Sequence, residues 1–230
     1  MWHEPSTWSV IVTGGSSGLG AAVCRSLAGV GAAVRSIDRR PSEDVETVHA
    51  DLADTAAAAE ATRQSIELLG GIDAVVCCAG TDTPGTFVDV DAKEWERVVA
   101  INLLGTAAVL RAAWPALLER RGRVVTVAST LGHRAVADAT AYCASKFGVI
   151  GLSRALAAEY KGRVGVTLLT PGGMRTAFFD DRAEKYKPPA DATLAEADDV
   201  AATVVWALGR PDGLEVKELA VMSPAEGSWP

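Results

Sequence analysis

The sequence predicts an α/β fold in which about seven parallel strands form one doubly wound sheet with helices on both faces. Three observations support this prediction. Short apolar runs rich in β-branched residues alternate with longer helical patterns along the 230 residues, as in parallel sheets covered on both sides. A glycine-rich turn follows the first of these runs. Neither a linker nor an internal repeat divides the chain, so residues 1–230 are expected to form a single domain.

The elements are expected in a regular order. The strands are short apolar runs, and we place them at residues 9–13, 33–37, just before Asp51, 74–78, 124–128, 164–169 and 218–222. The helices have longer patterns, and we place them at residues 17–29, 55–69, 92–120, 140–160 and 198–208. Pro115 lies inside the third helix and should kink or break it. Residues 177–197 interrupt the alternation and form either a lid over a pocket or a plain surface excursion.

Composition excludes several classes of protein. The 22 Lys and Arg residues against 29 Asp and Glu give a net charge of −7, so no basic surface is expected for nucleic acid or a membrane. No apolar run reaches the ~18 residues of a membrane-spanning helix, and residues 1–5 lack the parts of a secretory leader. The four cysteines form no C-x-x-C pair and the three histidines lie far apart. We therefore expect no metal site, no disulfide framework and reduced thiols in a cytoplasmic protein.

A turn with the sequence T-G-G-S-S-G-L-G joins the first strand to the first helix at residues 13–20. Missing side chains let a ligand approach the backbone closely. The free N–H groups and the dipole at the start of the helix favour an anion such as a pyrophosphate. The alternative is a tight turn that only packs. As a nucleotide site, the turn would contribute Gly14, Ser16, Ser17, Gly18, Leu19 and Gly20.

Asp38 ends the second strand, 18 residues after Gly20. A carboxylate there can accept hydrogen bonds from both ribose hydroxyls of an adenosine and would repel a 2′-phosphate. The sequence therefore favours NAD(H) over NADP(H), although Arg39 and Arg40 follow and a guanidinium pairs well with phosphate. Asp38 and Arg39 are both placed among the cofactor-binding residues. The alternative role of Asp38 is to cap the next turn.

Tyr142 and Lys146 form a Y-x-x-x-K pattern in the helix expected at residues 140–160. Residues four apart lie on one helix face, so the ammonium should lower the pKa of the tyrosine from about 10 toward neutrality. Such a tyrosine can act as a general acid or base. Ser129 follows the strand at 124–128 and can hold the reacting oxygen of a carbonyl or alcohol. Taken alone, the pattern is no more than two residues on a helix surface.

The glycine spacing T-G-x-x-x-G-x-G and four later residues resemble the classical short-chain dehydrogenase/reductase family; the four are Asn102, Ser129, Tyr142 and Lys146. The extended branch of that family has T-G-x-x-G-x-x-G, which would need glycine at Ser17. The resemblance runs from residue 9 to about residue 222 and implies a Rossmann-like fold. It also implies an NAD(P)(H)-dependent oxidoreductase that interconverts a small-molecule secondary alcohol and a ketone, working as a homodimer or homotetramer.

The resemblance also implies roles for single residues. Tyr142 would be the catalytic acid or base, Lys146 would lower its pKa and grip the ribose, and Ser129 would orient the reacting oxygen. Asn102 would hold a water that links the lysine to solvent, whereas taken alone it is a satisfied core amide. Further cofactor contacts are implied for Asp51 and Leu52 at the adenine, for Cys78, Ala79 and Gly80 at the nicotinamide ribose, and for Pro171, Gly172, Met174 and Thr176 at the carboxamide.

Two parts of the chain depart from the family pattern. The family has N-N-A-G after the fourth strand, whereas this chain has C-C-A-G at residues 77–80. A thiol donates weakly, so local order is expected to suffer, and the cysteines are either a buried apolar pair or redox-active. The end of the chain lacks the usual glycine pair, and Trp229 either packs on another subunit or frays. His133 is expected in a solvated loop, with a place facing the substrate as the alternative.

These departures keep other hypotheses open. One is a dinucleotide-binding sensor or scaffold whose catalytic groups are vestigial, and another is a dehydratase or epimerase on the same fold. The fold does not identify the substrate. Leu131, Phe178 and Phe179 favour a partly hydrophobic one.

Overall fold

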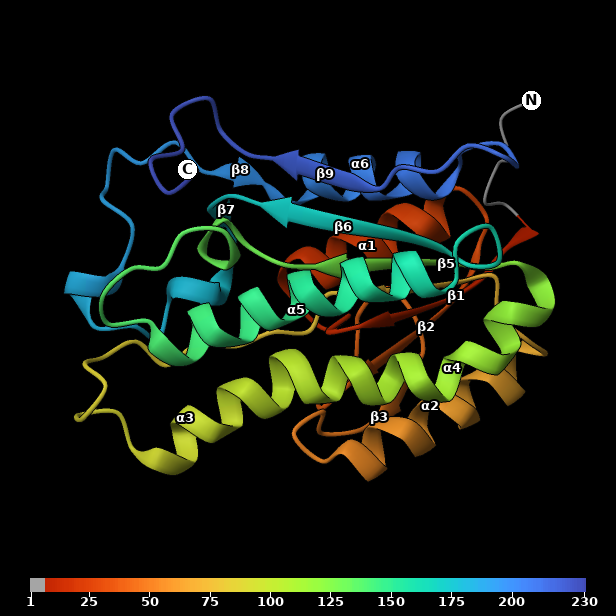
Figure 1. Ribbon diagram of the computed structural model, residues 1–230, viewed down its shortest axis with the longest axis horizontal. Helices are drawn as coiled ribbons and strands as arrows, with labels where there is room; N and C mark the ends of the chain where they lie inside the picture. The colour runs from red at the N-terminus through yellow and green to blue at the C-terminus, as the bar shows by residue number, and fades with distance from the viewer. Residues whose placement is uncertain (1–6) are drawn as a thin grey trace.

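The computed structural model describes residues 7–230. Residues 1–6 lie outside the described residues, and the prediction about a leader at residues 1–5 falls on them. Seven parallel strands form one sheet (Figure 1), in the order β3 (Thr47–His49), β2 (Ala33–Asp38), β1 (Ser9–Thr13), β4 (Ala74–Cys77), β5 (Arg123–Val127), β6 (Gly165–Pro171) and β9 (Glu218–Val221). The predicted fold class is confirmed. A small additional pair joins β7 (Met174–Arg175) to β8 (Ala195–Glu196).

Helices cover both faces of the sheet (Figure 1). One layer consists of α1 (Gly18–Gly29) and α6 (Ala197–Leu208), and the other of α2 (Thr55–Leu69), α4 (Thr106–Arg120) and α5 (Thr140–Glu159). Along β1, Val10 and Val12 pack into the first layer and Ile11 into the second. Successive side chains of a strand point to opposite faces, which is why the three central residues of this strand are all apolar.

The strand order reverses between β1 and β4, because β1 pairs with β2 on one side and with β4 on the other. In open α/β sheets, ligands bind in the crevice beyond the carboxyl ends of the strands at such a point. Here the glycine-rich turn follows β1 and residues 78–85 follow β4. The topology therefore brings both loops to one edge of the sheet.

The helical pattern expected at residues 92–120 is present, but its irregularity lies elsewhere than predicted. It consists of α3 (Ala92–Val99), a π-helical turn at Ala100–Gly105, and α4. The expected break at Pro115 is wrong, because α4 continues through this residue. Pro115 and Arg111, whose carbonyl loses its hydrogen-bond donor, are both exposed residues. The π turn carries Asn102, and such turns often occur at functional sites.

Among the described residues, the run Ala92–Arg120 is long and apolar enough to cross a membrane, with a mean hydropathy of 1.4. Half of its most apolar window is buried inside the protein. Core helices meet the same criterion of length and composition, so this single run is weak evidence for a membrane segment.

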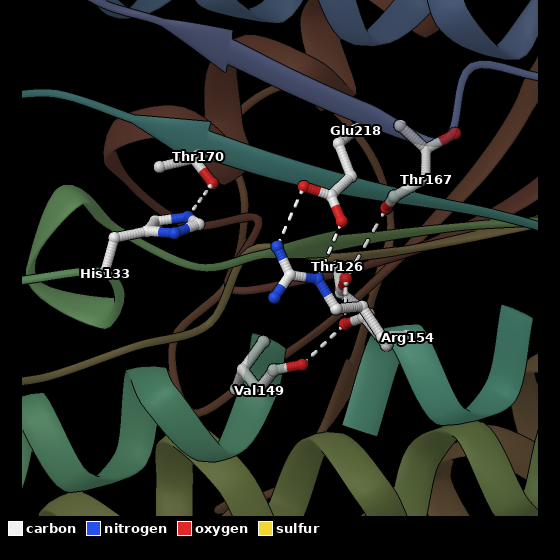
Figure 2. A network of polar contacts seen from close by, with 8 residues as sticks. Thr126, His133, Val149, Arg154, Thr167, Thr170 and Glu218 are labelled. Carbon is white, nitrogen blue, oxygen red and sulfur yellow. Dashed lines mark hydrogen bonds and ion pairs between the residues drawn. The ribbon is translucent and has the colours of Figure 1, made fainter. Parts of the chain in front are cut away.

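Helix α5 is tied to the sheet by buried hydroxyl groups. Ser153 on α5 shares a 2.6 Å hydrogen bond with Thr126 of β5 and donates to the carbonyl of Val149. At the surface, Arg154 of α5 makes a bidentate ion pair with Glu218 of β9, at 2.7 and 3.1 Å (Figure 2). These contacts hold α5 in place, and with it Tyr142 and Lys146 near its start.

Candidate active site

One cavity of about 1190 Å³ lies at the carboxyl edge of the sheet. All the site residues predicted from the sequence line it except Asn102. They are Gly14, Ser16, Ser17, Gly18, Leu19, Gly20, Asp38, Arg39, Asp51, Leu52, Cys78, Ala79, Gly80, Ser129, Tyr142, Lys146, Pro171, Gly172, Met174 and Thr176. Residues from distant parts of the sequence therefore meet at one site.

The glycine-rich turn has the shape that a dinucleotide requires. Gly14 has a φ of +75°, and a Cβ there would lie 2.8 Å from the Cα of Ala79. A side chain at Gly20 would collide with the Gly14 backbone. Ser17 makes no side-chain cap to α1, and the first turn of this helix carries no acidic residue. Its N–H groups can therefore bind a pyrophosphate, and the residues present fit an NAD(P)(H) cofactor.

Two carboxylates line the part of the cavity where the adenosine is expected. Asp38 accepts hydrogen bonds from the Ser16 N–H at 3.1 Å, the Ser16 hydroxyl at 2.7 Å and the Arg40 N–H at 3.0 Å. Asp51 accepts from the Ala53 N–H at 3.0 Å and pairs with Arg97 at 2.8 Å. Burial alone would raise the pKa of Asp51, but these two partners outweigh burial and lower it.

Ser129, Tyr142 and Lys146 form a cluster in the same cavity. Ser129 follows β5 and begins a 3-10 turn at Thr130–Gly132. Tyr142 and Lys146 lie one turn apart on α5, and Ser129 is close enough to the Tyr142 hydroxyl to influence its pKa. The Lys146 ammonium donates to the Val127 carbonyl at 2.9 Å and lies 5.6 Å from the centroid of the Tyr142 ring.

The pKa values of this cluster differ from the expectation. Burial raises the pKa of Tyr142 to about 12, and the hydrogen bond with Ser129 opposes this shift. Burial also lowers the pKa of Lys146 to about 8. The prediction that Lys146 lowers the pKa of Tyr142 is wrong for the protein without a bound cofactor. The ammonium lies over the ring and is bound to Val127, so burial dominates over attraction between the two groups.

Asn102 lies outside the cavity wall and anchors the loop after β4. Its side-chain oxygen accepts from the Thr81 N–H at 2.8 Å, and its NH₂ group donates to the Thr81 carbonyl at 2.9 Å and to the Ser145 hydroxyl at 3.0 Å. A Cβ at Gly80 would lie 3.5 Å from both Asn102 Oδ1 and Lys146 Nζ. The Asn102 side chain therefore spans from this loop to α5, close to the lysine.

Two cysteines lie at the end of β4. Cys77 is buried in β4, and burial raises the pKa of its thiol to about 12. The Ala79 N–H donates to the Thr13 hydroxyl at 3.2 Å, which ties the two strand ends together. Thr13 supplies a polar link at this point, and the loss of local order expected from the thiols stays a prediction. All four cysteines are free thiols.

The loop after β6 is held by residues that the sequence did not single out. The Gly173 N–H donates to Glu226 Oε2 at 2.8 Å, and the Gly172 N–H donates to the Val221 carbonyl at 3.0 Å. Residues 225–228 also line the cavity. Thr176, at the far end of the loop, lies beside the glycine-rich turn, 3.6 Å from a Cβ placed on Gly18.

The 177–197 segment contributes a wall of the cavity. It contains 3-10 turns at Ala177–Phe179 and Glu184–Tyr186. The Phe178 ring lies 5.9 Å from the Tyr142 ring, centroid to centroid. The Tyr186 hydroxyl donates to Asp138 at 2.9 Å, and Arg182 pairs with Asp82 at 2.9 Å. The segment is thereby joined to two other loops around the site.

His133 is half-buried, which differs from the solvated loop histidine that we expected. Its ring hydrogen-bonds with the Thr170 hydroxyl at 3.1 Å (Figure 2) and packs against Trp229, with 5.3 Å between centroids. His133 is absent from the cavity wall. Trp229 thus has a partner within its own chain.

Within residues 7–230, no group of three or more His, Cys, Asp or Glu side chains lies close enough to hold a metal ion.

Known proteins share both the sequence pattern and the fold. The family model described as short chain dehydrogenase matches residues 9–187. Acetoacetyl-CoA reductase from Allochromatium vinosum is 30% identical over 226 residues, covering 88% of this chain and 92% of that protein. Glycine betaine reductase ATRR from Emericella nidulans is 31% identical over 231 residues, which cover 92% of this chain but 18% of that protein.

A solved structure of an alcohol dehydrogenase from the archaeon Thermococcus sibiricus, complexed with 5-hydroxy-NADP, has the same fold. It matches with a TM-score of 0.84 and 24% identity, covering 94% of this chain and 97% of that one. The family match extends over most of the sequence, and the cavity has the predicted residues on its walls. The chain therefore belongs to the short-chain dehydrogenase/reductase family of oxidoreductases.

Proposed function

We propose that this protein is an NAD(P)(H)-dependent oxidoreductase that interconverts a small-molecule secondary alcohol and a ketone. One observation carries the proposal. Tyr142 and Ser129 line the same cavity as the glycine-rich turn, with Lys146 beside the tyrosine ring. A cofactor held by that turn can therefore meet a substrate held by this pair.

Each residue of the cluster has a defined task in this proposal. When bound, the nicotinamide supplies or accepts the hydride. Ser129 orients the reacting oxygen, and the Tyr142 hydroxyl donates a proton to it during reduction and accepts one during oxidation. Lys146 holds a positive charge near the phenol and binds the ribose. Asn102 fixes the loop that carries Gly80 beside Lys146, and so supports proton relay.

We propose NAD(H) as the preferred cofactor over NADP(H). Asp38 ends β2 at the cavity wall, and its charge would repel a 2′-phosphate. Arg39 and Arg40 lie on the same wall and provide the opposing attraction. The test compares kcat/KM for NADH and NADPH with one ketone. An equal or higher value with NADPH contradicts this preference.

The Tyr142→Phe variant tests the catalytic role. Removing the hydroxyl eliminates the proton donor, so turnover of any active ketone should fall at least about 100-fold, while the affinity for NADH stays within about threefold. The absorbance of the reduced nicotinamide measures the first quantity, and a fluorescence titration measures the second. Tyr160→Phe is the matched control, because Tyr160 packs against Trp114 away from the cavity. Substantial turnover by Tyr142→Phe contradicts the role.

The alternative function is a dinucleotide-binding sensor or scaffold with vestigial catalytic groups. Its motivation is the C-C-A-G sequence at residues 77–80 and the unusual end of the chain. Binding of NADH without turnover of any carbonyl in a broad panel would favour it over the oxidoreductase.

The organisation of the protein is also proposed. We treat residues 1–230 as one catalytic domain in a cytoplasmic homodimer or homotetramer, with the 177–197 segment as a lid over the substrate. Leu104 and Phe147 support an oligomer, because they are 50% and 46% exposed on elements that pack together. Neither nucleic acid nor a membrane is a proposed partner.

A further inference from the structure

Residues 225–228 form part of the cavity wall and have no task in the mechanism above. They belong to the end of the chain, where the sequence departs from the family pattern, and they follow the edge strand β9. A turn stabilises their path, since the Glu226 N–H donates to the carbonyl of the buried Ser223 at 3.0 Å. These residues are therefore held at the cavity by contacts within the chain.

Ser228 and Glu226 form a chain of hydrogen bonds with the turn that follows Ser129. The Ser228 hydroxyl donates to Glu226 Oε1 at 2.6 Å. It also lies 2.6 Å from the Thr130 hydroxyl. Because the single proton of the Ser228 hydroxyl is used on the carboxylate, Thr130 is the donor in the second bond. Thr130 is buried and directly follows Ser129, so the chain of bonds begins next to the residue that is proposed to orient the reacting oxygen.

The same carboxylate binds the loop after β6. Glu226 Oε2 accepts from the Gly173 N–H at 2.8 Å, while Oε1 also accepts from the Ser228 N–H at 3.0 Å. Gly173 lies among the residues that are expected to hold the nicotinamide carboxamide. Three hydrogen bonds therefore lead from Thr130 through Ser228 and Glu226 to Gly173.

A second set of contacts joins the same parts of the protein. The His133 ring hydrogen-bonds with the Thr170 hydroxyl of β6 at 3.1 Å (Figure 2), and Trp229 packs on this ring. The Arg134 guanidinium donates to the Gly227 carbonyl at 3.2 Å. The turn after β5 is thus joined both to β6 and to the end of the chain.

We propose that Ser228 is a positioning residue, which holds the turn carrying Ser129 and the loop after β6 at the separation that hydride transfer requires. Ser129 would fix the reacting oxygen of the substrate, and the loop would fix the nicotinamide. The rate of transfer between two held groups depends steeply on their distance and orientation. This inference rests on the proposed function and adds a positioning residue to it.

A merely structural task for Ser228 is the competing explanation. In that case, loss of the hydroxyl would lower the fraction of active protein but leave hydride transfer unchanged in each active molecule. The rate constant of a single turnover does not depend on the active fraction, whereas its amplitude does. The two explanations therefore predict different results.

The first test measures amide hydrogen exchange of the protein without cofactor, in peptides that cover residues 129–134 and 171–176. Ser228→Ala removes both hydrogen bonds of the hydroxyl, so exchange should rise at least about threefold in both peptides. Ser228→Thr keeps a hydroxyl and should exchange as the wild type does. Ser42→Ala is the matched control, because the Ser42 hydroxyl also accepts a hydrogen bond, from the Asp44 N–H, but lies outside the cavity wall. A rise in only one of the two peptides, or in neither, overturns the inference.

The second test follows a single turnover of a reducible ketone by stopped flow, with enzyme in excess over NADH. Ser228→Ala should lower the rate constant of hydride transfer about tenfold or more, and Ser228→Thr should restore it to within about threefold of the wild type. An unchanged rate constant in Ser228→Ala, with or without a loss of amplitude, overturns the inference. If the wild type reduces no ketone, the proposed function fails, and the exchange measurement alone decides whether Ser228 couples the two segments.

Discussion

Lys146 shows how burial controls the charge at one residue of the site. Lys146 is buried at 4% exposure, and the Val127 carbonyl accepts a hydrogen bond from its ammonium at 2.9 Å. This burial lowers the pKa of Lys146 to about 8, whereas an unfolded lysine keeps about 10.4. Between these two values the unfolded chain binds more protons than the folded protein. The free energy of unfolding therefore rises with pH in this interval.

Lys146→Met removes this dependence. From pH 7 to pH 9 the wild-type protein should gain about 1 kcal/mol of stability that the variant lacks, because the wild type loses its buried charge over this range. Urea unfolding at both pH values measures the difference. If the free energy of unfolding changes equally in both proteins between pH 7 and pH 9, the buried charge of the lysine does not lower the stability.

Gly20 and Gly29 form a matched pair at the two ends of α1. A Cβ on Gly20 would lie 2.6 Å from the Gly14 carbonyl carbon, whereas a Cβ on Gly29 has nothing within 4 Å. Gly20→Ala should displace the glycine-rich turn and weaken NADH binding at least about tenfold. Gly29→Ala should leave the affinity unchanged and stabilise the protein by a few tenths of a kcal/mol, up to about 1. A fluorescence titration with NADH measures both, and equal affinities would contradict the close packing described for Gly20.

At the scale of elements, the loop after β6 depends on the end of the chain. Residues 171–176 are expected to hold the nicotinamide carboxamide, and the Gly173 N–H is bound by Glu226. Burial opposes the charge of Glu226, but hydrogen bonds from Ser228 and Gly173 outweigh it and lower the pKa of this carboxyl group. The Glu226 carboxylate is thus charged at neutral pH and held by these hydrogen bonds, and it positions the loop after β6.

Glu226→Ala should affect the nicotinamide end of the cofactor site and leave the ADP-ribose end unaffected. Affinity for NADH should fall about fivefold or more because the loop loses a charged anchor, while affinity for ADP-ribose, which lacks the nicotinamide, should stay unchanged. Titration of both ligands gives the comparison. Glu196→Ala is the control, since Glu196 makes an exposed ion pair with Arg175. An equal loss for both ligands would mean that Glu226 supports the fold in general.

The elements also show why some features were predictable and others were not. The strands and long helices follow from local apolar patterns, and the glycine-rich turn and the Y-x-x-x-K pattern are local as well. Gly105, at the end of the π turn Ala100–Gly105, lies against Leu52, 53 residues earlier, and local spacing does not reveal this contact. Asp82 meets Arg182 across 100 positions. The pKa of Tyr142 was mispredicted because burial, which no motif encodes, outweighs the neighbouring charge.

At the scale of the whole molecule, an apolar surface remains on the side of α5. Phe147 on α5 is 46% exposed, and Leu104 in the neighbouring π turn is 50% exposed. A second subunit would remove both side chains from water, and each Å² of apolar surface buried contributes about 25 cal/mol. This surface supports the proposed homodimer or homotetramer.

Phe147→Asp should weaken that assembly, because the variant would bury an unpaired charge. Sedimentation at micromolar concentration should show a smaller species than the wild type. Leu214→Asp is the control, since Leu214 is equally exposed in the loop between α6 and β9. A wild-type protein that is already monomeric, or a variant of unchanged mass, would place the interface elsewhere.

The anchoring of Gly173 by Glu226 also has a consequence for the order of events during translation. The glycine-rich turn and the strands β1 to β4 precede the loop after β6, so the ribosome releases the phosphate-binding part of the site before that loop. The carboxamide-binding half has to wait for β9 and residues 225–228, which emerge some 50 residues after the loop that they support. The complete site can therefore form only after these residues have been synthesised, and a polypeptide that stops before them would lack the anchor of the carboxamide-binding loop.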